Sequence, residues 1–241
     1  MENLQANLKG LRLGGMAATL PVRYQEAKAN ELDYLQFIEQ LVTDELGRRK
    51  DNLLNRRIKM ARFPTLKTFE DFDWDFNPAL SKRQLNELAS CKFVHQAKNI
   101  LLVGPPGVGK THISLAVGLH AIQNGYTVNY RSAFDLVEDL AEAFRMEQRK
   151  KLVQQLAKYN VLIVDEFGMK KMPPHAADDL LEIIHRRHGY AATIIATNRP
   201  IKDWGTILGD NAATSAILDR FLENAEILTI KGRSYRMKGK G

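Results

Sequence analysis

Residues 104–111, GPPGVGKT, place glycines, a lysine and a hydroxyl at the spacing that binds the phosphates of a nucleotide. They match the pattern G-x-x-x-x-G-K-[ST] at every fixed position. Glycines let such a loop curl until its backbone N–H groups face phosphate oxygens, and the next helix adds its positive N-terminal end. In this pattern Lys110 neutralises the β- and γ-phosphates, and Thr111 offers its hydroxyl to Mg²⁺. The predicted nucleotide-binding residues are Gly104, Pro105, Pro106, Gly107, Val108, Gly109, Lys110, Thr111 and His112.

A second candidate for phosphate chemistry is VLIVDEFG, residues 161–168, in which four apolar residues precede two acids. The pattern predicts a buried strand whose carboxyl end emerges beside the phosphate loop. Asp165 would then hold Mg²⁺ through water, and Glu166 would polarise the water that attacks the γ-phosphate. Two acids after a strand can also form a solvated turn. Their position one βαβ unit beyond the loop favours the catalytic interpretation.

A third polar position ends the segment TIIATN, residues 193–198. Asn198 can orient the attacking water or sense the γ-phosphate, whereas the alternative is a turn before Arg199-Pro200, a dipeptide that disfavours helix. Its place next to the Asp-Glu strand favours the first role. Arg220 is the predicted arginine for a γ-phosphate in its own subunit or a neighbour's. Arg186 and Arg187, at the end of their predicted helix, are the alternatives. An exposed helical arginine is usually only solvated, so the pattern alone does not decide among the three.

Apolar strands and helices of ten or more residues alternate from residue 99 onward. This order predicts an α/β fold with a parallel five-stranded sheet covered by helices on both faces. Gly125 and Gly189 stand where helix C-caps belong, and Ser132 with Asp135 predicts a capping box. The predicted strands are residues 99–103, 126–131, 160–166, 192–198 and 225–230.

Residues 1–68 predict a small, all-helical N-terminal domain. Leu4, Leu8 and Leu11 share one helix face, Gly14-Gly15 interrupts it, and a second helix is expected to open at Asn30 in a capping-box arrangement with Asp33. A connector over 69–98 and an ATPase domain over 99–241 follow. The connector aromatics Phe69, Phe72, Trp74 and Phe76 are interpreted as anchors on the core, since the acids beside them would repel nucleic-acid phosphates.

The net charge of +7 over 241 residues is clustered, which favours a polyanionic partner. A charge run usually forms a solvated helix face. Residues 47–62, however, contain seven basic residues and a single acid, Asp51. A second basic run covers 231–240, and Lys170 with Lys171 are weaker candidates for a channel in an oligomer. Nothing nearby resembles a base-reading module, so binding with little sequence preference is expected. The predicted DNA-binding residues are Arg48, Arg49, Lys50, Arg56, Arg57, Lys59 and Arg62.

Other features restrict the class of protein. The longest apolar runs are too short to cross a bilayer, and the N-terminus lacks the apolar core of a signal peptide. The single cysteine, Cys91, excludes an internal disulfide and fits a cytoplasmic protein. Few residues follow the last strand, so no helical lid is expected. Nucleotide would then bind on an open face that a neighbouring subunit or partner completes, with weak, assembly- or DNA-dependent hydrolysis.

Across nearly its whole length the chain resembles the IstB-like ATP-binding proteins, which help bacterial insertion sequences transpose and are relatives of the helicase loader DnaC. The motifs that carry the resemblance are LKGLRLGGMAATL, LDYLQFIEQLVTDEL, GPPGVGKTHISLAVG, VLIVDEFG, TIIATNRP and AILDRF. It implies an AAA+ core with Lys110 and Thr111 in Walker A, Asp165 and Glu166 in Walker B, and Asn198 as sensor 1. Arg220 lies in the arginine-bearing box, although the helicase loader has an additional arginine where this chain has Ala216.

The resemblance also implies partners: duplex DNA, a transposase and further copies of the chain, assembled with ATP in the bacterial cytoplasm, at the nucleoid when DNA-bound. A helicase loader that grips a replicative helicase and single-stranded DNA is the first alternative. A metabolic or signalling NTPase with an incidental basic surface is the second. The N-terminal segment favours the first interpretation over the helicase loader, and the clustered charge argues against a plain NTPase.

Overall fold

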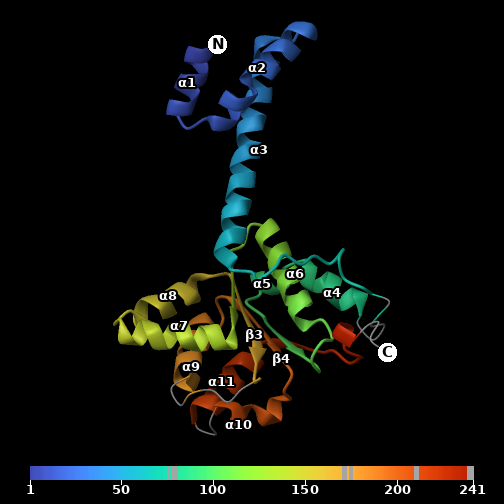
Figure 1. The fold of residues 1–241 in the computed structure, drawn as a ribbon, viewed down its shortest axis with the longest axis vertical. Coiled ribbons are helices and arrows are strands. Elements are labelled where there is room, and N and C mark those ends of the chain that lie inside the picture. Colours follow the sequence, from blue (N-terminus) through green and yellow to red (C-terminus); the bar gives the residue numbers. More distant parts are fainter. Residues whose placement is uncertain (75, 77–80, 170–172, 174–175, 209–211, 238–241) are drawn as a thin grey trace. The chain divides into compact units, whose positions relative to one another are not determined.

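The computed structural model describes residues 1–74, 76, 81–169, 173, 176–208 and 212–237 (Figure 1). The chain forms two compact units, Met1–Arg56 and Arg57–Gly241. The boundary falls inside the long helix α3 (Tyr34–Ala61), so the basic cluster at 48–62 belongs partly to each unit.

The first unit is helical, as predicted, and contains a helix that the glycines obscured. Helix α1 (Glu2–Gly10) is followed by α2 (Gly14–Ala29), which begins at the glycine pair instead of being interrupted by it. A Cβ on Gly15 would lie 2.7 Å from the Cα of Glu45, so only glycine permits this approach of α2 to α3. The Glu45 carboxylate accepts hydrogen bonds from the N–H groups of Gly15 and Met16. Glu45 thereby caps α2 from a neighbouring helix.

The capping box expected at Asn30 and Asp33 is wrong, because the box is formed by Asp33 and Gln36. Asn30 follows the last residue of α2, and α3 begins at Tyr34. Asp33 is the capping residue: its Oδ1 accepts from the Gln36 N–H at 2.8 Å, and the Gln36 side chain accepts from the Asp33 N–H at 3.1 Å. Gln36 thus fills the second position of the capping box, which was predicted for Asp33.

The second unit contains the predicted parallel sheet. Its five strands lie in the order β2-β3-β4-β1-β5, and every pair is parallel. Each predicted strand is present within two residues at either end, because apolar runs bounded by turns specify buried parallel strands. The strands are β1 (Asn99–Val103), β2 (Val128–Ser132), β3 (Val161–Phe167), β4 (Ala192–Thr197) and β5 (Ala225–Thr229).

Helices cover both faces of this sheet, which confirms the predicted α/β fold (Figure 1). One face packs against α6, with α4 and α5 beside it; the other carries α7 to α11. Ser132 caps α7 by accepting from the Asp135 N–H at 3.0 Å, and Gly125 and Gly189 adopt the expected positive φ angles of 90° and 73°. The helices are α4 (Lys82–Ala89), α5 (Lys92–His95), α6 (Lys110–Gln123), α7 (Ala133–Arg145), α8 (Arg149–Lys158), α9 (Ala176–Arg187), α10 (Trp204–Leu208) and α11 (Ala212–Leu222), with short 3₁₀ turns at Ile201–Asp203 and Tyr235–Met237.

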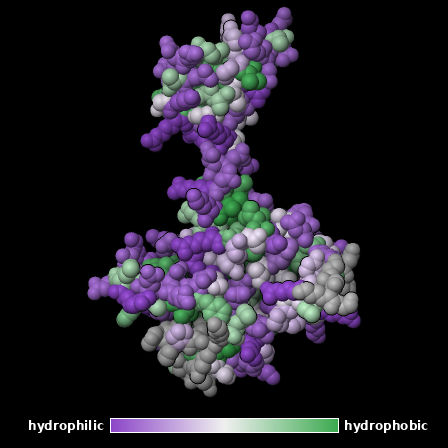
Figure 2. Space-filling model, viewed as in Figure 1, coloured by the Kyte–Doolittle hydropathy of each residue, from purple (hydrophilic) through white to green (hydrophobic). Residues whose placement is uncertain are grey.

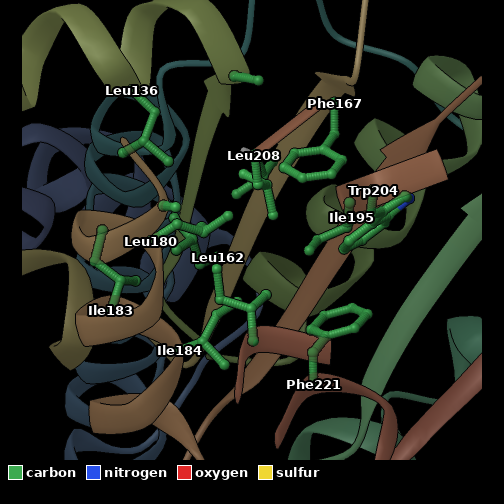
Figure 3. Close-up of a cluster of buried hydrophobic side chains, with 14 of the residues drawn as sticks. Leu136, Leu162, Phe167, Leu180, Ile183, Ile184, Ile195, Trp204, Leu208 and Phe221 are labelled. Carbon is green, nitrogen blue, oxygen red and sulfur yellow. The ribbon is translucent and has the colours of Figure 1, made fainter. Parts of the chain in front are cut away.

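The largest apolar cluster lies between the sheet and helices α7 to α11 (Figure 3). Phe167, Trp204 and Phe221 form a column of rings, with centroids 4.3 Å and 6.3 Å apart. Leucines and isoleucines of α9 and the strands fill the space beside it. This packing fixes the end of β3, where the predicted acids stand. Hydrophilic side chains cover most of the visible surface around α7 and α8 (Figure 2).

Two of the connector aromatics contact α6 within the second unit, as the anchor interpretation predicts. The ring of Phe69 lies 5.4 Å from that of His120, and the ring of Phe72 lies 5.1 Å from that of His112. Upstream of the connector, the ring of Phe63 packs against Gly118 of α6. A Cβ on Gly118 would lie 2.9 Å from that ring. Residues 75 and 77–80 of the connector lie outside the described ranges. Within those ranges, no helix has both the length and the apolar composition needed to span a membrane.

Arg187 is a structural arginine at the end of α9. Its side chain is 1% exposed and faces carbonyl groups instead of a carboxylate. Its guanidinium donates to the carbonyls of Leu156 and Tyr159, both at 2.8 Å, and also bonds the carbonyl of Ala192 and the hydroxyl of Thr193. Burial lowers the pKa of Arg187 to about 9, so the group remains charged at neutral pH. The guanidinium therefore joins α8, α9 and β4 through satisfied backbone groups.

Replacing Arg187 with methionine is expected to lower the free energy of unfolding by about 2–4 kcal/mol, since the change leaves several buried carbonyls without donors. The matched control is Arg186→Met, because Arg186 pairs with Glu182 on the surface at 2.9 Å and such a pair contributes less than about 1 kcal/mol. Urea unfolding followed by circular dichroism measures both changes. Equal effects of the two substitutions would contradict the structural role of Arg187.

Candidate nucleotide-binding site

The phosphate loop leaves β1 at Val103 and enters α6 at Lys110. Gly107 and Gly109 have φ angles of 82° and 99°, a region that favours glycine. A Cβ on Gly109 would lie 2.9 Å from the ring of Phe72. Within the described residues, the N–H groups of Gly107, Val108 and Gly109 donate no hydrogen bond. The loop therefore presents consecutive free donors, as a phosphate site requires.

Lys110 is held by the loop that precedes it. Its ammonium donates to the carbonyls of Gly104 at 2.7 Å and Pro105 at 2.8 Å. Burial lowers the pKa of Lys110, the negative charge of Asp165 opposes that shift, and the positive charge of Arg236 adds to it. The cation thus stands between the loop and the acidic end of β3, where it can neutralise phosphate oxygens.

Asp165 is 2% exposed and has both carboxylate oxygens engaged. One oxygen accepts from the Tyr130 hydroxyl at 3.1 Å, and the other accepts from the Glu166 N–H at 2.8 Å. Burial, followed by the charge of Asp165, raises the pKa of Tyr130, so this phenol stays protonated as a donor. Tyr130 of β2 therefore fixes the orientation of the carboxylate, a positioning role that the sequence did not reveal because the two residues meet only across β2 and β3.

Glu166 occupies an irregular position in β3. Its φ angle is 57°, and the pairing of β3 with β4 shifts register between Val164 and Phe167. A left-handed conformation costs a non-glycine residue about 1–2 kcal/mol, so this position is strained. The irregularity leaves the side chain of Glu166 exposed in the cavity while the residues on either side, Asp165 and Phe167, stay buried.

Asn198 lies at the end of β4 and lines the same cavity. Its neighbour Thr197 is fixed by a hydrogen bond from the hydroxyl to the Phe167 carbonyl at 2.7 Å. The side-chain oxygen of Asn198 is buried and has no hydrogen-bond partner among the described residues. Buried polar atoms are nearly always satisfied, so this oxygen fits a water or nucleotide group that completes it.

These groups surround one cavity of about 460 Å³ at the carboxyl edge of the sheet. Residues 106–112 of the phosphate loop, the acidic pair and Asn198 were predicted to meet there and do so, whereas the predicted residues Gly104 and Pro105 do not line the cavity. Two walls were not predicted: one comes from the connector and the residues just before it, and the other from the C-terminal segment. No local pattern marks them, because their places depend on packing across the unit. The added lining residues include Thr65, Lys67, Asp71, Phe72, Asp73, Phe76, Leu115, Met169, Tyr235 and Arg236.

The site fits a nucleotide with Mg²⁺. The free N–H groups and Lys110 suit a polyphosphate, and Thr111 and Asp165 are the protein groups that would hold the ion. Among the described residues, no group of three or more histidine, cysteine or acidic side chains is arranged to hold a metal ion. Mg²⁺ does not need one, since it is usually bound by one or two protein groups plus phosphate oxygens and water.

The candidate arginines differ in position. Arg187 is buried among carbonyls, so its guanidinium has no access to a nucleotide. Arg186 pairs with Glu182 on the surface and does not line the cavity of its own chain, and a role for it across a subunit contact stays a prediction. Arg220 is half-buried on α11 and does not line the cavity of its own chain; its Nη1 lies 3.5 Å from the Ala216 carbonyl. A role for Arg220 in its own subunit therefore has no support, and a role across a subunit contact stays a prediction.

The predicted DNA-binding cluster is divided by its internal contacts. Arg48 bonds the Gly14 carbonyl, and Arg49 donates to Glu45 at 2.7 Å. Arg62 pairs with Asp139 at 3.5 Å. Arg57 is half-buried, whereas Lys50, Arg56 and Lys59 are exposed and make no ion pair within the described residues. Lys170, Lys171, Lys238 and Lys240 lie outside those residues.

Comparisons with known proteins agree with this geometry. The ATP-binding protein of insertion sequence IS21 from Pseudomonas aeruginosa is 35% identical over 240 residues, covering 100% of this chain and 91% of the relative. The corresponding protein of IS5376 from Geobacillus stearothermophilus is 34% identical, covering 99% and 95%.

Solved structures show the same core. The DnaC helicase loader matches with a TM-score of 0.53 and 26% identity, over 66% of this chain and 98% of that one. AMPPCP-bound DnaA from Aquifex aeolicus matches in fold, with a TM-score of 0.58 and 20% identity over 73% and 54%. These likenesses confirm an AAA+ P-loop fold. The family model described as IstB-like ATP binding protein matches residues 6–241, and the chain belongs to that family.

Proposed function

We propose that this protein is an ATPase that assembles with ATP on duplex DNA and assists a transposase in selecting target DNA. The observation that carries the ATPase part is the convergence of free loop N–H groups, Lys110, the Asp165–Glu166 pair and the unsatisfied Asn198 oxygen on one cavity. The insertion-sequence context of the relatives supports a transposase as partner. By this proposal the protein acts in the bacterial cytoplasm, at the nucleoid when DNA-bound.

The residues of the cavity suggest how hydrolysis proceeds. The Glu166 carboxylate accepts a proton from the attacking water, and the Asn198 side chain orients that water. Lys110 and the loop N–H groups offset the negative charge that develops on the transferred phosphoryl group. Mg²⁺, when bound beside Thr111 and Asp165, supplies further charge neutralisation.

Two substitutions separate ATP binding from hydrolysis. Lys110→Ala removes the cation against the phosphates, so ATP affinity should fall by at least about tenfold. Glu166→Gln keeps the size of the side chain and removes the base, so it should bind ATP normally and release phosphate about a hundredfold or more slowly. Titration with a fluorescent ATP analogue and a phosphate-release assay measure the two quantities. Normal hydrolysis by Glu166→Gln would contradict the assigned base.

The position of Arg220 outside its own cavity supports a role in a neighbour's site. Such an arrangement makes hydrolysis depend on assembly, because each active site takes its base from one chain and its arginine from the next. An arginine at a γ-phosphate can contribute a thousandfold or more in rate, on the order of other arginine fingers.

Mixing two inactive variants tests this arrangement. Arg220→Ala sites keep Glu166, and Glu166→Gln chains keep Arg220, so a mixed assembly forms some complete sites. The mixture should hydrolyse ATP several-fold faster than the mean of the two separate variants, in the presence of DNA. The matched control replaces Arg220→Ala with Lys110→Ala, which cannot be rescued by a neighbour. Equal rates in both mixtures would exclude Arg220 as a shared residue.

The DNA part of the proposal rests on the free basic residues of α3. Lys50, Arg56 and Lys59 have no internal ion pairs within the described residues, so their charges are available to phosphates. Arg48, Arg49 and Arg62 each have an internal partner. Their side chains nevertheless remain exposed, so they can also contact phosphates. Binding of this kind follows the phosphate backbone and is expected to depend strongly on salt.

Replacing Lys50, Arg56 and Lys59 together by alanine should weaken duplex binding and flatten its salt dependence. Each lost phosphate contact lowers the log–log slope by about 0.9, so up to about 2.7 for three contacts. The matched control replaces three exposed cations of the second unit, Arg145, Lys150 and Lys151, and should leave the slope unchanged. Fluorescence anisotropy with a slowly hydrolysed ATP analogue measures both. Equal slopes in the two triple variants would contradict the assignment.

The likeness to DnaC supports a helicase loader as the second candidate function. A loader would prefer single-stranded DNA and bind a replicative helicase, whereas a transposition helper would prefer duplex DNA and need the triphosphate state. The same anisotropy measurement, repeated with single strands, decides between them. A plain metabolic NTPase would bind neither form of DNA.

A further inference from the structure

The residues after β5 return to the phosphate loop. The Ile230 N–H donates to the Val103 carbonyl at 2.7 Å, and the Tyr235 N–H donates to the Gly107 carbonyl at 2.8 Å. Between these two bonds, the Ser234 side chain occupies the space into which a Cβ on Gly107 would project. Backbone hydrogen bonds thus join the C-terminal segment to the end of β1 at Val103 and to the middle of the phosphate loop at Gly107.

Tyr235 also contacts the other added wall of the cavity. Its ring lies 5.0 Å from the ring of Phe76 at an interplanar angle of 85°, an edge-to-face arrangement. Both rings line the cavity. The segment is therefore positioned from two sides, by the loop carbonyl and by a connector aromatic, which determines where the next residue can stand.

That next residue is Arg236, which is exposed and lines the cavity with Lys110. Its positive charge is felt at Lys110, whose pKa it helps to lower. No carboxylate pairs with Arg236 within the described residues. Two cations that share a cavity repel each other. A bound polyanion attracts both of them and offsets that repulsion.

We infer that Arg236 is a second phosphate-binding cation of the nucleotide site, delivered by the segment that follows β5. This inference rests on the proposed binding of ATP and adds a residue to it. It also revises the expectation of an open face, since Tyr235 and Arg236 supply a wall of the cavity from the few residues that follow β5. The ligand it selects is a polyphosphate, with the nucleoside held elsewhere.

Arg236→Ala tests the contact against a matched change, Arg233→Ala, in the same basic segment but outside the cavity. Arg236→Ala should weaken ATP binding about tenfold, the usual loss of one charge-assisted hydrogen bond, and Arg233→Ala less than twofold. Arg236→Lys should recover part of the loss. Competition by adenosine, which has no phosphate, should be equal in all four proteins. Each affinity is measured by displacing a fluorescent ATP analogue.

A second measurement does not depend on substitution. Trypsin cleaves after exposed arginines, so ATP should slow cleavage after Arg236 more than cleavage after Arg233, as followed by mass spectrometry. Equal ATP affinities of Arg236→Ala and Arg233→Ala, or equal protection of the two bonds, would overturn the inference while leaving ATP binding intact. Failure of the unmodified protein to bind ATP would instead overturn the proposed function. A loss of adenosine competition in Arg236→Ala would indicate a collapsed cavity and also count against a phosphate contact.

Discussion

The phosphate loop must keep its N–H groups free for a ligand, and the rest of the second unit is arranged around that constraint. A loop whose N–H groups make no internal hydrogen bonds is stable only if other contacts hold it. Beyond Gly104, whose N–H donates to the Thr197 carbonyl at 3.2 Å, other contacts reach the loop through its carbonyls or through the space left by absent side chains. Lys110 and Tyr235 bond loop carbonyls, while Phe72 and Ser234 pack against Gly109 and Gly107. The donors thereby stay available and the loop still has a fixed shape.

The same constraint explains which parts of the site could be predicted from the sequence. The loop, the Asp-Glu pair and Asn198 each follow a buried strand, and parallel strands bring their carboxyl ends to one edge, so local patterns suffice to predict their meeting. Phe72, Phe76, Tyr235 and Arg236 reach the cavity through contacts across the unit. Nothing in their own neighbourhoods distinguishes an anchor or a basic tail from a wall of the site.

The N-terminal unit shows the reverse situation, in which a strong local signal was misleading. Two consecutive glycines normally end a helix, because they lose the most backbone freedom and add no packing. Gly14 and Gly15 instead begin α2, since their lack of side chains admits the Glu45 carboxylate to the free N–H groups. Arg49 then pairs with that carboxylate, which lowers the pKa of Glu45. An arginine predicted for DNA therefore also supports a helix start.

The arrangement of the cavity suggests how one ligand could control binding of another. One wall of the nucleotide cavity comes from residues that follow the basic end of α3 along the chain: Thr65, Lys67, Asp71, Phe72, Asp73 and Phe76. If ATP raises the affinity for DNA through this segment, DNA must raise the affinity for ATP by the same factor, because binding free energies are reciprocally coupled. The strained backbone of Glu166 and the buried contacts of Asp165 are held by the sheet, whereas the contacts of the connector and C-terminal walls include aromatic pairs and a backbone hydrogen bond to the loop. A change in nucleotide state is thus expected to act first on those two walls, since they lie outside the hydrogen-bonded sheet.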